Sequence, residues 1–223
     1  MGELLTKLRQ QGLLKLHLSM RDGTFRDLSG NGNHGTPSGA EIRKSENGFS
    51  GWFDGVNDFV NLGDHLDPLT EDFTLLCWIK TRVIGHAGLM SKEAAAQTDR
   101  FYMGLDAVGA LMGFFRVDGT SEFENAFGGV SLADDILHHV AITFARDGNA
   151  IGYVDGIAEP TTYDISGAAG KTFDNTLNLI LGARNNGTSN FFTGFMDHPI
   201  GLLSALPATE VAQLMAETKP RGM

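Results

Sequence analysis

Cysteine is nearly missing from this 223-residue sequence, in which Cys77 stands alone. One cysteine excludes an intrachain disulfide, and no His/Cys spacing supports a zinc site. Cys77 lies inside an apolar run, where we expect a buried, unreactive thiol. Long apolar runs are missing as well, because no stretch approaches the roughly 18 residues of a membrane-spanning helix. We therefore expect no membrane insertion.

The amino-terminal residues lack the pattern of a secretory signal. Such signals combine a basic start, an apolar stretch of roughly 7–15 residues and a small-residue cleavage site. Residues 1–11 instead interleave charges with leucines. We expect a protein made in the cytoplasm, with no classical export route.

Basic residues are outnumbered, with 17 Lys and Arg against 27 Asp and Glu, for a net charge of −10. Nucleic-acid affinity comes mostly from clustered cations that release counterions. The longest basic block here is Arg43-Lys44, which excludes nucleic acid as a primary partner. An acidic balance keeps a protein soluble at high local concentration.

A catalytic constellation is the last feature that is missing. Glu122-Phe123-Glu124 places two carboxylates on one strand face, and retaining glycoside hydrolases need such a pair roughly 5–5.5 Å apart. Glu122 follows the turn-forming stretch 118–121, which favours a solvated hairpin end. Residues 166–172 imitate a phosphate loop, but the first glycine of that motif would fall at Ile165. We predict that the protein is not an enzyme.

Alternating short runs between glycine-containing turns are what the sequence does have. In Phe73–Lys80 and Leu14–Met20, apolar residues recur at every second position, as in β-strands. Asp147-Gly148 and Asp155-Gly156 bracket the short run Ile151–Val154, as two hairpins in series would. The 29 Gly and 15 Phe suit tight turns around an aromatic core. These patterns predict an all-β protein built from two antiparallel sheets.

Five motifs then occur in the order of one known family. They are Trp52-Phe53-Asp54-Gly55, His138-His139-Val140-Ala141, Tyr153-Val154-Asp155-Gly156, Phe192-Thr193-Gly194-Phe195-Met196-Asp197, and the closing stretch Leu206–Leu214 with Glu210. From Leu14 to Met215 the chain resembles the laminin-G-like, concanavalin A-like jelly-roll domains of the lectin/glucanase superfamily. The resemblance implies a two-sheet antiparallel jelly-roll β-sandwich with a carboxyl-terminal helix.

The aromatic residues are divided between an expected core and an expected surface. The predicted core consists of Phe53, Phe59, Phe73, Leu75, Cys77, Val140, Ile142, Tyr153, Leu181 and Phe195. The resemblance places Trp52 and Trp78 at core positions, and it leaves Tyr102 and Tyr163 as candidates for exposure. Sugar sites on such sandwiches use exposed aromatics with a few polar partners, so support for a lectin is thin.

The predicted organisation is a helical extension at 1–12, a jelly-roll domain at 13–217 and a tail at 218–223. Leu4, Leu5 and Leu8 share one stripe of the first helix. One interpretation is that this helix plugs an end of the sandwich. The alternative is that the three leucines dock a partner. Pro207 is placed to start the second helix, which runs through Glu217.

A glycine- and asparagine-rich loop at 27–35 is the candidate metal site. In relatives, such a loop joins an Asp from the last strand to hold a structural Ca²⁺, which implies the ligands Asp27, Asn31, Asn33, Gly35 and Asp197. Ca²⁺ takes six to eight oxygen ligands, and glycine lets carbonyls turn inward. The alternative is a series of Asx turns that only reverses the chain.

The predicted function is that of a structural or display protein of a phage virion, on its capsid or tail, with weak glycan affinity. This rests on the family resemblance and on the missing catalytic constellation. Its expected partners are other virion proteins, copies of itself and cell-surface or environmental glycans. The alternatives are a carbohydrate-binding module and, third, a glycoside hydrolase that uses Glu122 and Glu124.

Overall fold

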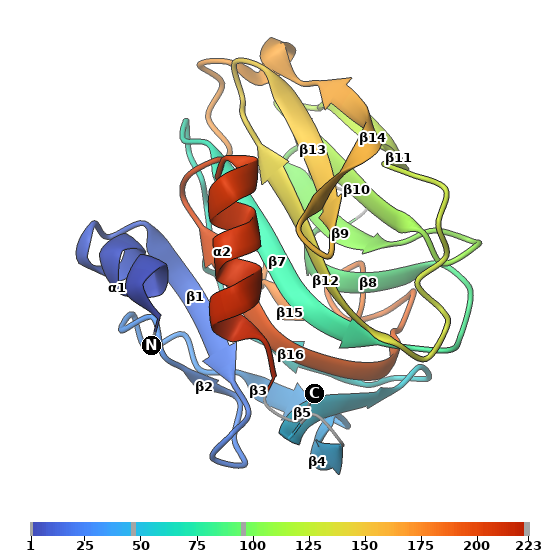
Figure 1. Cartoon of the computed structure of the whole chain (residues 1–223). Helices are drawn as coiled ribbons and strands as arrows, with labels where there is room; N and C mark the ends of the chain where they lie inside the picture. Colours follow the sequence, from blue (N-terminus) through green and yellow to red (C-terminus); the bar gives the residue numbers. More distant parts are fainter. Residues whose placement is uncertain (1, 46–47, 95–96, 221–223) are drawn as a thin grey trace.

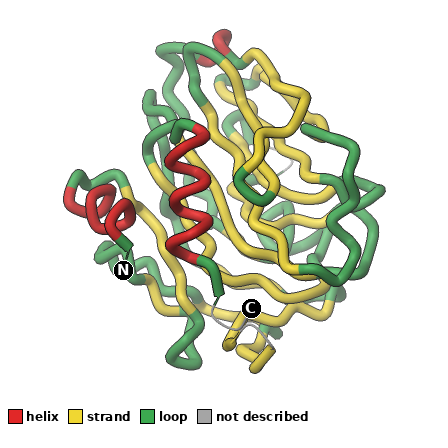
Figure 2. The backbone as a smooth tube through the Cα atoms, in the orientation of Figure 1, coloured by secondary structure: helices red, strands yellow, loops and turns green. Residues whose placement is uncertain are grey.

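The computed structural model describes residues 2–45, 48–94 and 97–220. In this part of the chain, two antiparallel sheets pack face to face, and two α-helices lie against the outer face of one of them (Figures 1 and 2). The predicted jelly-roll sandwich is confirmed. The elements are α1 (Glu3–Gln10), β1 (Leu14–Ser19), β2 (Arg26–Asp27), β3 (Thr36–Ser38), β4 (Glu41–Ser45), β5 (Gly48–Asp54), β6 (Phe59–Asn61), β7 (Phe73–Lys80), β8 (Ala87–Lys92), β9 (Arg100–Leu105), β10 (Leu111–Val117), β11 (Thr120–Ala126), β12 (Leu137–Phe144), β13 (Asn149–Val154), β14 (Ile157–Asp164), the 3₁₀ turn η1 (Ser166–Ala168), β15 (Ile180–Leu181), β16 (Thr193–Leu202) and α2 (Ala208–Thr218).

The two sheets differ in size among the described strands. The nine-stranded sheet runs β14-β13-β12-β7-β16-β1-β2, with β5 and β4 added beside β16. The seven-stranded sheet runs β11-β10-β9-β8-β15-β6-β3. In the nine-stranded sheet, β16 lies between β7 and β5, so that Phe195 stands opposite both Lys80 and Trp52. Directly opposed residues share a face of the sheet, and this row positions the site described below.

Phenylalanine rings fill the space between the sheets. Phe73 and Phe144 stack with their centroids 4.0 Å apart, and Phe101 and Phe115 pack against Phe73. Most of the predicted core lies in this cluster or in a second one, the helix-side cluster, where residues of α1 and α2 pack on the outer face of the nine-stranded sheet. Two predicted core residues, Phe59 and Phe195, are only half-buried, which corrects the prediction for both. Tyr153 is buried on the outer face of its sheet, in contact with the helix-side cluster.

The two helices cover the middle of the outer face of the nine-stranded sheet (Figure 1). Val211 and Leu214 of α2 pack on Leu76 and Ile200 of the sheet, which explains why β7 is apolar on both faces. Leu4, Leu5 and Leu8 of α1 are buried in the same cluster. The chain itself therefore surrounds these leucines, as the plug interpretation expects. Docking of a partner through them stays a prediction, which requires α1 to leave this position.

A carboxylate ties the two helices together. The backbone amides of Leu4 and Leu5, in the first turn of α1, donate to the Glu217 carboxylate at 2.8 and 3.1 Å. These amides have no acceptor inside the helix, and a carboxylate also suits the positive end of the helix dipole.

Among the described residues, no helix has the length and apolarity needed to span a membrane.

Candidate functional site

Two half-buried aromatic rings meet on the outer face of the nine-stranded sheet, beyond the end of α2. Trp52 on β5 and Phe195 on β16 stand opposite each other, with ring centroids 4.8 Å apart. α2 ends at Thr218, whose hydroxyl accepts a hydrogen bond of 2.9 Å from the Trp78 indole. On β7, Lys80 is the next residue after Trp78 whose side chain points outward. The row formed by Trp52, Phe195 and Lys80 therefore lies next to Trp78, beyond the end of α2.

The exposure of Trp52 follows from the alternation of β5. Phe53, its neighbour, is fully buried between the sheets, so Trp52 points outward. The prediction that Trp52 is a core residue is therefore wrong. Trp78 is buried, but beneath α2 rather than between the sheets.

Charged side chains surround these rings and form a groove of about 450 Å³. The lining residues are Arg43, Trp52, Lys80, Thr81, Arg82, Val83, Asp135, Thr193, Gly194 and Phe195, and we call this the Trp52 groove. The Arg43 guanidinium lies 4.9 Å from the centre of the Trp52 ring and also pairs with Glu41 at 2.9 Å. On the other side, Asp135 contacts Lys80 at 3.9 Å and forms a closer pair with Arg82.

This arrangement suits the recognition of a flat, hydroxyl-rich molecule. An exposed aromatic ring offers an apolar surface, and charged groups at its border supply hydrogen bonds that fix orientation. The guanidinium groups of Arg43 and Arg82 each carry five N–H donors. The signal in the sequence was the Trp52-Phe53 pair, since two adjacent aromatics in a strand must face opposite sides.

The outer face of the seven-stranded sheet carries a second aromatic group, which is buried. Tyr102 and Phe114 stack with centroids 5.5 Å apart, and the Arg184 guanidinium lies 3.7 Å from the Tyr102 ring centre. Arg184 Nε donates to Glu93 at 2.6 Å, and the Tyr102 hydroxyl donates to Glu124 at 3.0 Å. We call these five residues the Tyr102 stack. Tyr102 is fully buried, so its predicted exposure is wrong, and burial raises the pKa of its phenol.

The two carboxylates considered for hydrolysis have different standing. Glu124 is exposed, and its carboxylate is engaged by Tyr102 and lies 3.6 Å from Arg184. The side chain of Glu122 lies outside the described residues. Tyr163, the other predicted surface tyrosine, is half-buried, and its hydroxyl donates to the Ala126 carbonyl at 2.6 Å.

The predicted calcium loop is held by its own hydrogen bonds. Asp27 accepts from the backbone amides of His17, Ser29 and Asn33 at 2.9–3.1 Å, and from the Ser29 hydroxyl at 2.7 Å. These bonds outweigh desolvation and lower the pKa of the Asp27 carboxyl. The side-chain amides of Asn31 and Asn33 donate to the Lys15 carbonyl at 3.0 and 2.9 Å. The Asx-turn alternative accounts for this arrangement, whereas Ca²⁺ binding stays a prediction.

Asp197, the predicted calcium ligand from the last strand, lies beside a pair of buried histidines. Its carboxylate accepts from the His198 backbone amide at 2.8 Å, while His198 Nδ1 lies 3.0 Å from His17 Nε2. Burial raises the pKa of Asp197 to about 7 and lowers that of His17 to about 4 and that of His198 to about 3. Both rings line a cavity of about 620 Å³ between the helices and β1.

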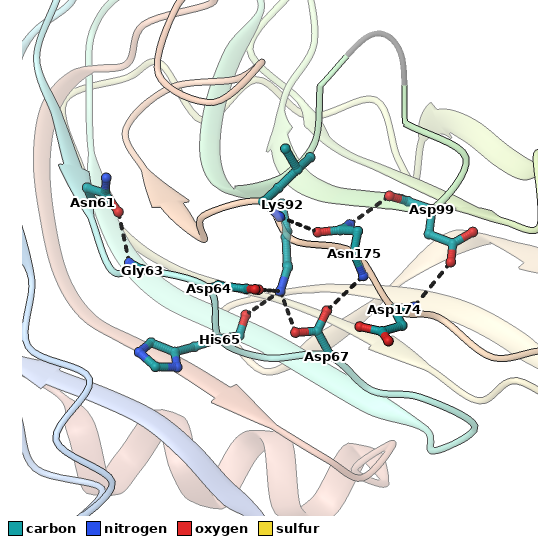
Figure 3. Close-up of polar contacts among 10 residues, drawn as sticks. Asn61, Gly63, Asp64, His65, Asp67, Lys92, Asp99, Asp174 and Asn175 are labelled. Carbon is teal, nitrogen blue, oxygen red and sulfur yellow. Dashed lines mark hydrogen bonds and ion pairs between the residues drawn. The ribbon is translucent and has the colours of Figure 1, made fainter.

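Sequence analysis missed the buried Lys92, which joins three segments at one end of the sandwich. Figure 3 shows Asp64 and Asp67 turned toward the Lys92 ammonium, at 2.7 and 2.6 Å from Nζ. Asn175 connects this group to Asp99, because its side-chain amide donates to the Asp99 carbonyl at 2.7 Å (Figure 3). Burial raises the pKa of Asp67, and the ammonium opposes that change.

A lysine thus supplies the cation that these carboxylates face. Among the described residues, no three His, Cys, Asp or Glu side chains are arranged to hold a metal ion.

The family model described as the concanavalin A-like lectin/glucanases superfamily matches residues 54–212. A search against curated protein sequences gave no match.

Solved structures with this fold include binding domains. The binding domain of Paraclostridial Mosquitocidal Protein 1 is 18% identical with a TM-score of 0.74, covering 94% of this chain and 53% of that one. Domain 4 of AbnA, a GH43 extracellular arabinanase from Geobacillus stearothermophilus in complex with arabinotriose, is 17% identical with a TM-score of 0.72, covering 91% and 98%. The binding domain of botulinum neurotoxin DC in complex with rat synaptotagmin II is 12% identical with a TM-score of 0.69, covering 95% and 52%. The chain spans about half the length of the first and third of these structures. At such identities the likeness shows the fold alone.

Proposed function

The chain belongs to the concanavalin A-like lectin/glucanase superfamily, and we propose that it is a non-catalytic binding domain that takes a saccharide in the Trp52 groove. The observation that carries this proposal is the half-exposed Trp52 ring, placed beside Phe195 at the border of a 450 Å³ groove. Sugar rings stack on such aromatic faces, and charged groups around them select hydroxyl positions.

Two further observations support a binding role. The structure with arabinotriose is of a domain that our chain covers almost completely, at 98% of its length. Glu93 and Glu124, which lie on the outer face of the other sheet, are both engaged by Arg184. Glycoside hydrolysis needs a pair of carboxylates that can reach the glycosidic bond, whereas these two are held in ion pairs with one guanidinium.

The test is a glycan array followed by calorimetric titration with the saccharides that bind. Trp52→Ala should weaken binding at least about tenfold, which corresponds to about 1.4 kcal/mol. Phe49→Ala is the matched control, because Phe49 is an exposed aromatic on the same strand that lies outside the groove lining. Equal losses in the two variants would argue against the groove as the binding site.

The more specific role in a phage virion stays a prediction. Its support is the acidic net charge of −10, which suits dense display, together with a binding surface that a particle could present to cell-surface glycans. Virion proteomics tests it directly, as do neighbouring genes for capsid and portal proteins. Genes for polysaccharide-degrading enzymes nearby would favour a carbohydrate-binding module instead.

A further inference from the structure

We infer that the Trp52 groove selects glycan chains that turn between successive sugar residues over chains that form flat ribbons. This inference rests on the proposed function, because it names the class of glycan for the same groove. It starts from the angle between two aromatic rings. The Trp52 and Phe195 rings both line the groove, and their planes are inclined by 59° with centroids 4.8 Å apart.

The two rings are neighbours in a row that crosses the strands. Trp52 on β5 stands opposite Phe195 on β16, and Phe195 stands opposite Lys80 on β7. Adjacent strands of a sheet lie about 4.8 Å apart, which is close to the spacing between neighbouring sugar rings in a glycan. A chain that follows this row can therefore present successive sugar residues to the two aromatic side chains.

The angle between the rings decides which chains contact both of them. A sugar residue packs its apolar C–H face against the plane of an aromatic ring. In a flat chain such as a β-1,4-linked glucan, successive sugar rings share one plane, so the chain cannot lie on two aromatic planes inclined by 59°. In an α-1,4- or β-1,3-linked glucan the chain turns at each linkage, and two neighbouring residues can each meet one aromatic ring.

The sheet holds this angle before any ligand binds. Trp52 is followed by Phe53, which is fully buried between the sheets. Phe195 follows Gly194, where a Cβ would collide with the Lys80 carbonyl, so β16 and β7 approach each other closely at this point. Aromatic side chains on paired strands lose little freedom on binding. A ligand must therefore fit the angle that the sheet provides.

Ion pairs limit the row at both ends. The Arg43 guanidinium lies over the Trp52 ring, 4.9 Å from its centre, so a ligand reaches this ring from the side of its aromatic neighbour. Arg43 is paired with Glu41, and Arg82 at the other end is paired with Asp135. Because each arginine already has a carboxylate partner, the shape of a chain rather than its charge distinguishes ligands here. We expect the aromatic contact to extend over two sugar residues.

The experiment compares oligosaccharides that are built from the same sugar and differ only in linkage. In the glucose set, cellohexaose is the flat member, and maltohexaose and laminarihexaose are the turning members. Mannose hexamers in β-1,4 and α-1,6 linkage form a second matched set. Calorimetric titration of the full chain should show that the better turning member binds at least about tenfold more tightly than the flat member of its set.

Phe195→Leu tests the role of the second ring, because it keeps an apolar side chain but removes the flat aromatic face. The ratio of affinities should fall to about threefold or less, while the flat member, which can use Trp52 alone, loses less affinity than the turning member. Phe49→Ala is the matched control, because Phe49 is an exposed aromatic on β5 outside the groove lining, and it should keep the wild-type ratio.

Three results would count against these proposals. Equal affinity for flat and turning members, with binding lost in Trp52→Ala, would overturn the shape selectivity and leave the proposed function standing. A wild-type ratio in Phe195→Leu would do the same. Absence of binding to these oligomers and to every glycan of the array would contradict the proposed function itself.

Discussion

The molecule carries an arginine stacked on an aromatic ring on each of its two outer faces, and the two arrangements differ in their surroundings. In the Trp52 groove, Arg43 is about half exposed and its ion pair with Glu41 lies at the surface. In the Tyr102 stack, Arg184 lies 3.7 Å from the ring centre and pairs with Glu93, which is 1% exposed. The same pair of residue types thus forms an open surface on one sheet and a closed layer on the other.

The cause of this difference is what lies above each face. On the seven-stranded sheet, the Arg184 guanidinium itself lies over Tyr102, 3.7 Å from the ring centre, and the Arg184 amide donates to the Ser189 carbonyl at 2.8 Å. The described part of α2 reaches only the Trp78 row of the nine-stranded sheet. A buried ion pair must keep both partners, because a lone charge in a buried site is costly, whereas exposed donors remain available to a ligand.

The largest effect on stability is expected when the carboxylate partner of each arginine is removed. Glu93→Ala leaves the Arg184 guanidinium without its buried partner and should lower the free energy of unfolding by about 4 kcal/mol. Glu41→Ala removes the exposed partner of Arg43 and should cost about 0.5 kcal/mol. Urea denaturation of both variants checks this. Similar losses in the two would mean that the layers do not differ as described.

Acid should act on the helix-covered face before the other one. Burial lowers the pKa of His17 and His139 to about 4 and that of His198 to about 3, from the ordinary 6.5. The unfolded chain therefore binds these protons first, and stability falls as the pH drops below about 6.5. Asp197 acts in the opposite direction, because its pKa of about 7 is raised, so its contribution is lost as the pH rises through 7.

His138 also opposes the loss, because its hydrogen bond to Asp155 raises its pKa. Three histidines with lowered pKa values outweigh these two groups, so we expect a net loss of stability between pH 7 and pH 5. Hydrogen exchange at pH 5 should show α1 and α2 opening before β9 and β10, which carry Tyr102 and Phe114. Replacing His139 by Gln should reduce the pH dependence. Uniform loss of protection across both sheets would contradict this order.

Asp27→Ala provides a smaller test, away from both aromatic groups. It removes the acceptor for three backbone amides and the Ser29 hydroxyl, and should lower the free energy of unfolding by about 2 kcal/mol. If these hydrogen bonds are its whole role, the loss is the same with added Ca²⁺ and with a chelator. A wild-type melting temperature that falls on chelation, with no such fall in Asp27→Ala, would establish the calcium site instead.

The fold could be predicted from the sequence, because strand alternation and Asp-Gly turns are local signals. β13 lies between the two predicted turns, and β7 has the predicted bounds Phe73–Lys80. Which aromatic is exposed was harder to predict, since helices cover only part of one outer face. Trp78 and Trp52 both point outward, yet only Trp78 lies under α2.

Ion pairs between residues far apart in the sequence could not be predicted from local patterns either. Lys92 meets Asp64 and Asp67 only after β8 is placed beside the loop that follows β6. Arg184 meets Glu93 across 91 positions of sequence. No sequence spacing predicts either ion pair, because the pairing of strands in the sheet brings the two partners together.

Tryptophan emission during saccharide titration tests the central claim most directly, because Trp52 and Trp78 are the two tryptophans of the chain. Trp78 is buried beneath α2, so the half-exposed Trp52 should carry the signal of a ligand in the groove. We predict a saturable change in the wild-type protein that disappears in Trp52→Phe. A change of equal size and midpoint in Trp52→Phe would contradict the assignment of the binding site to the Trp52 groove.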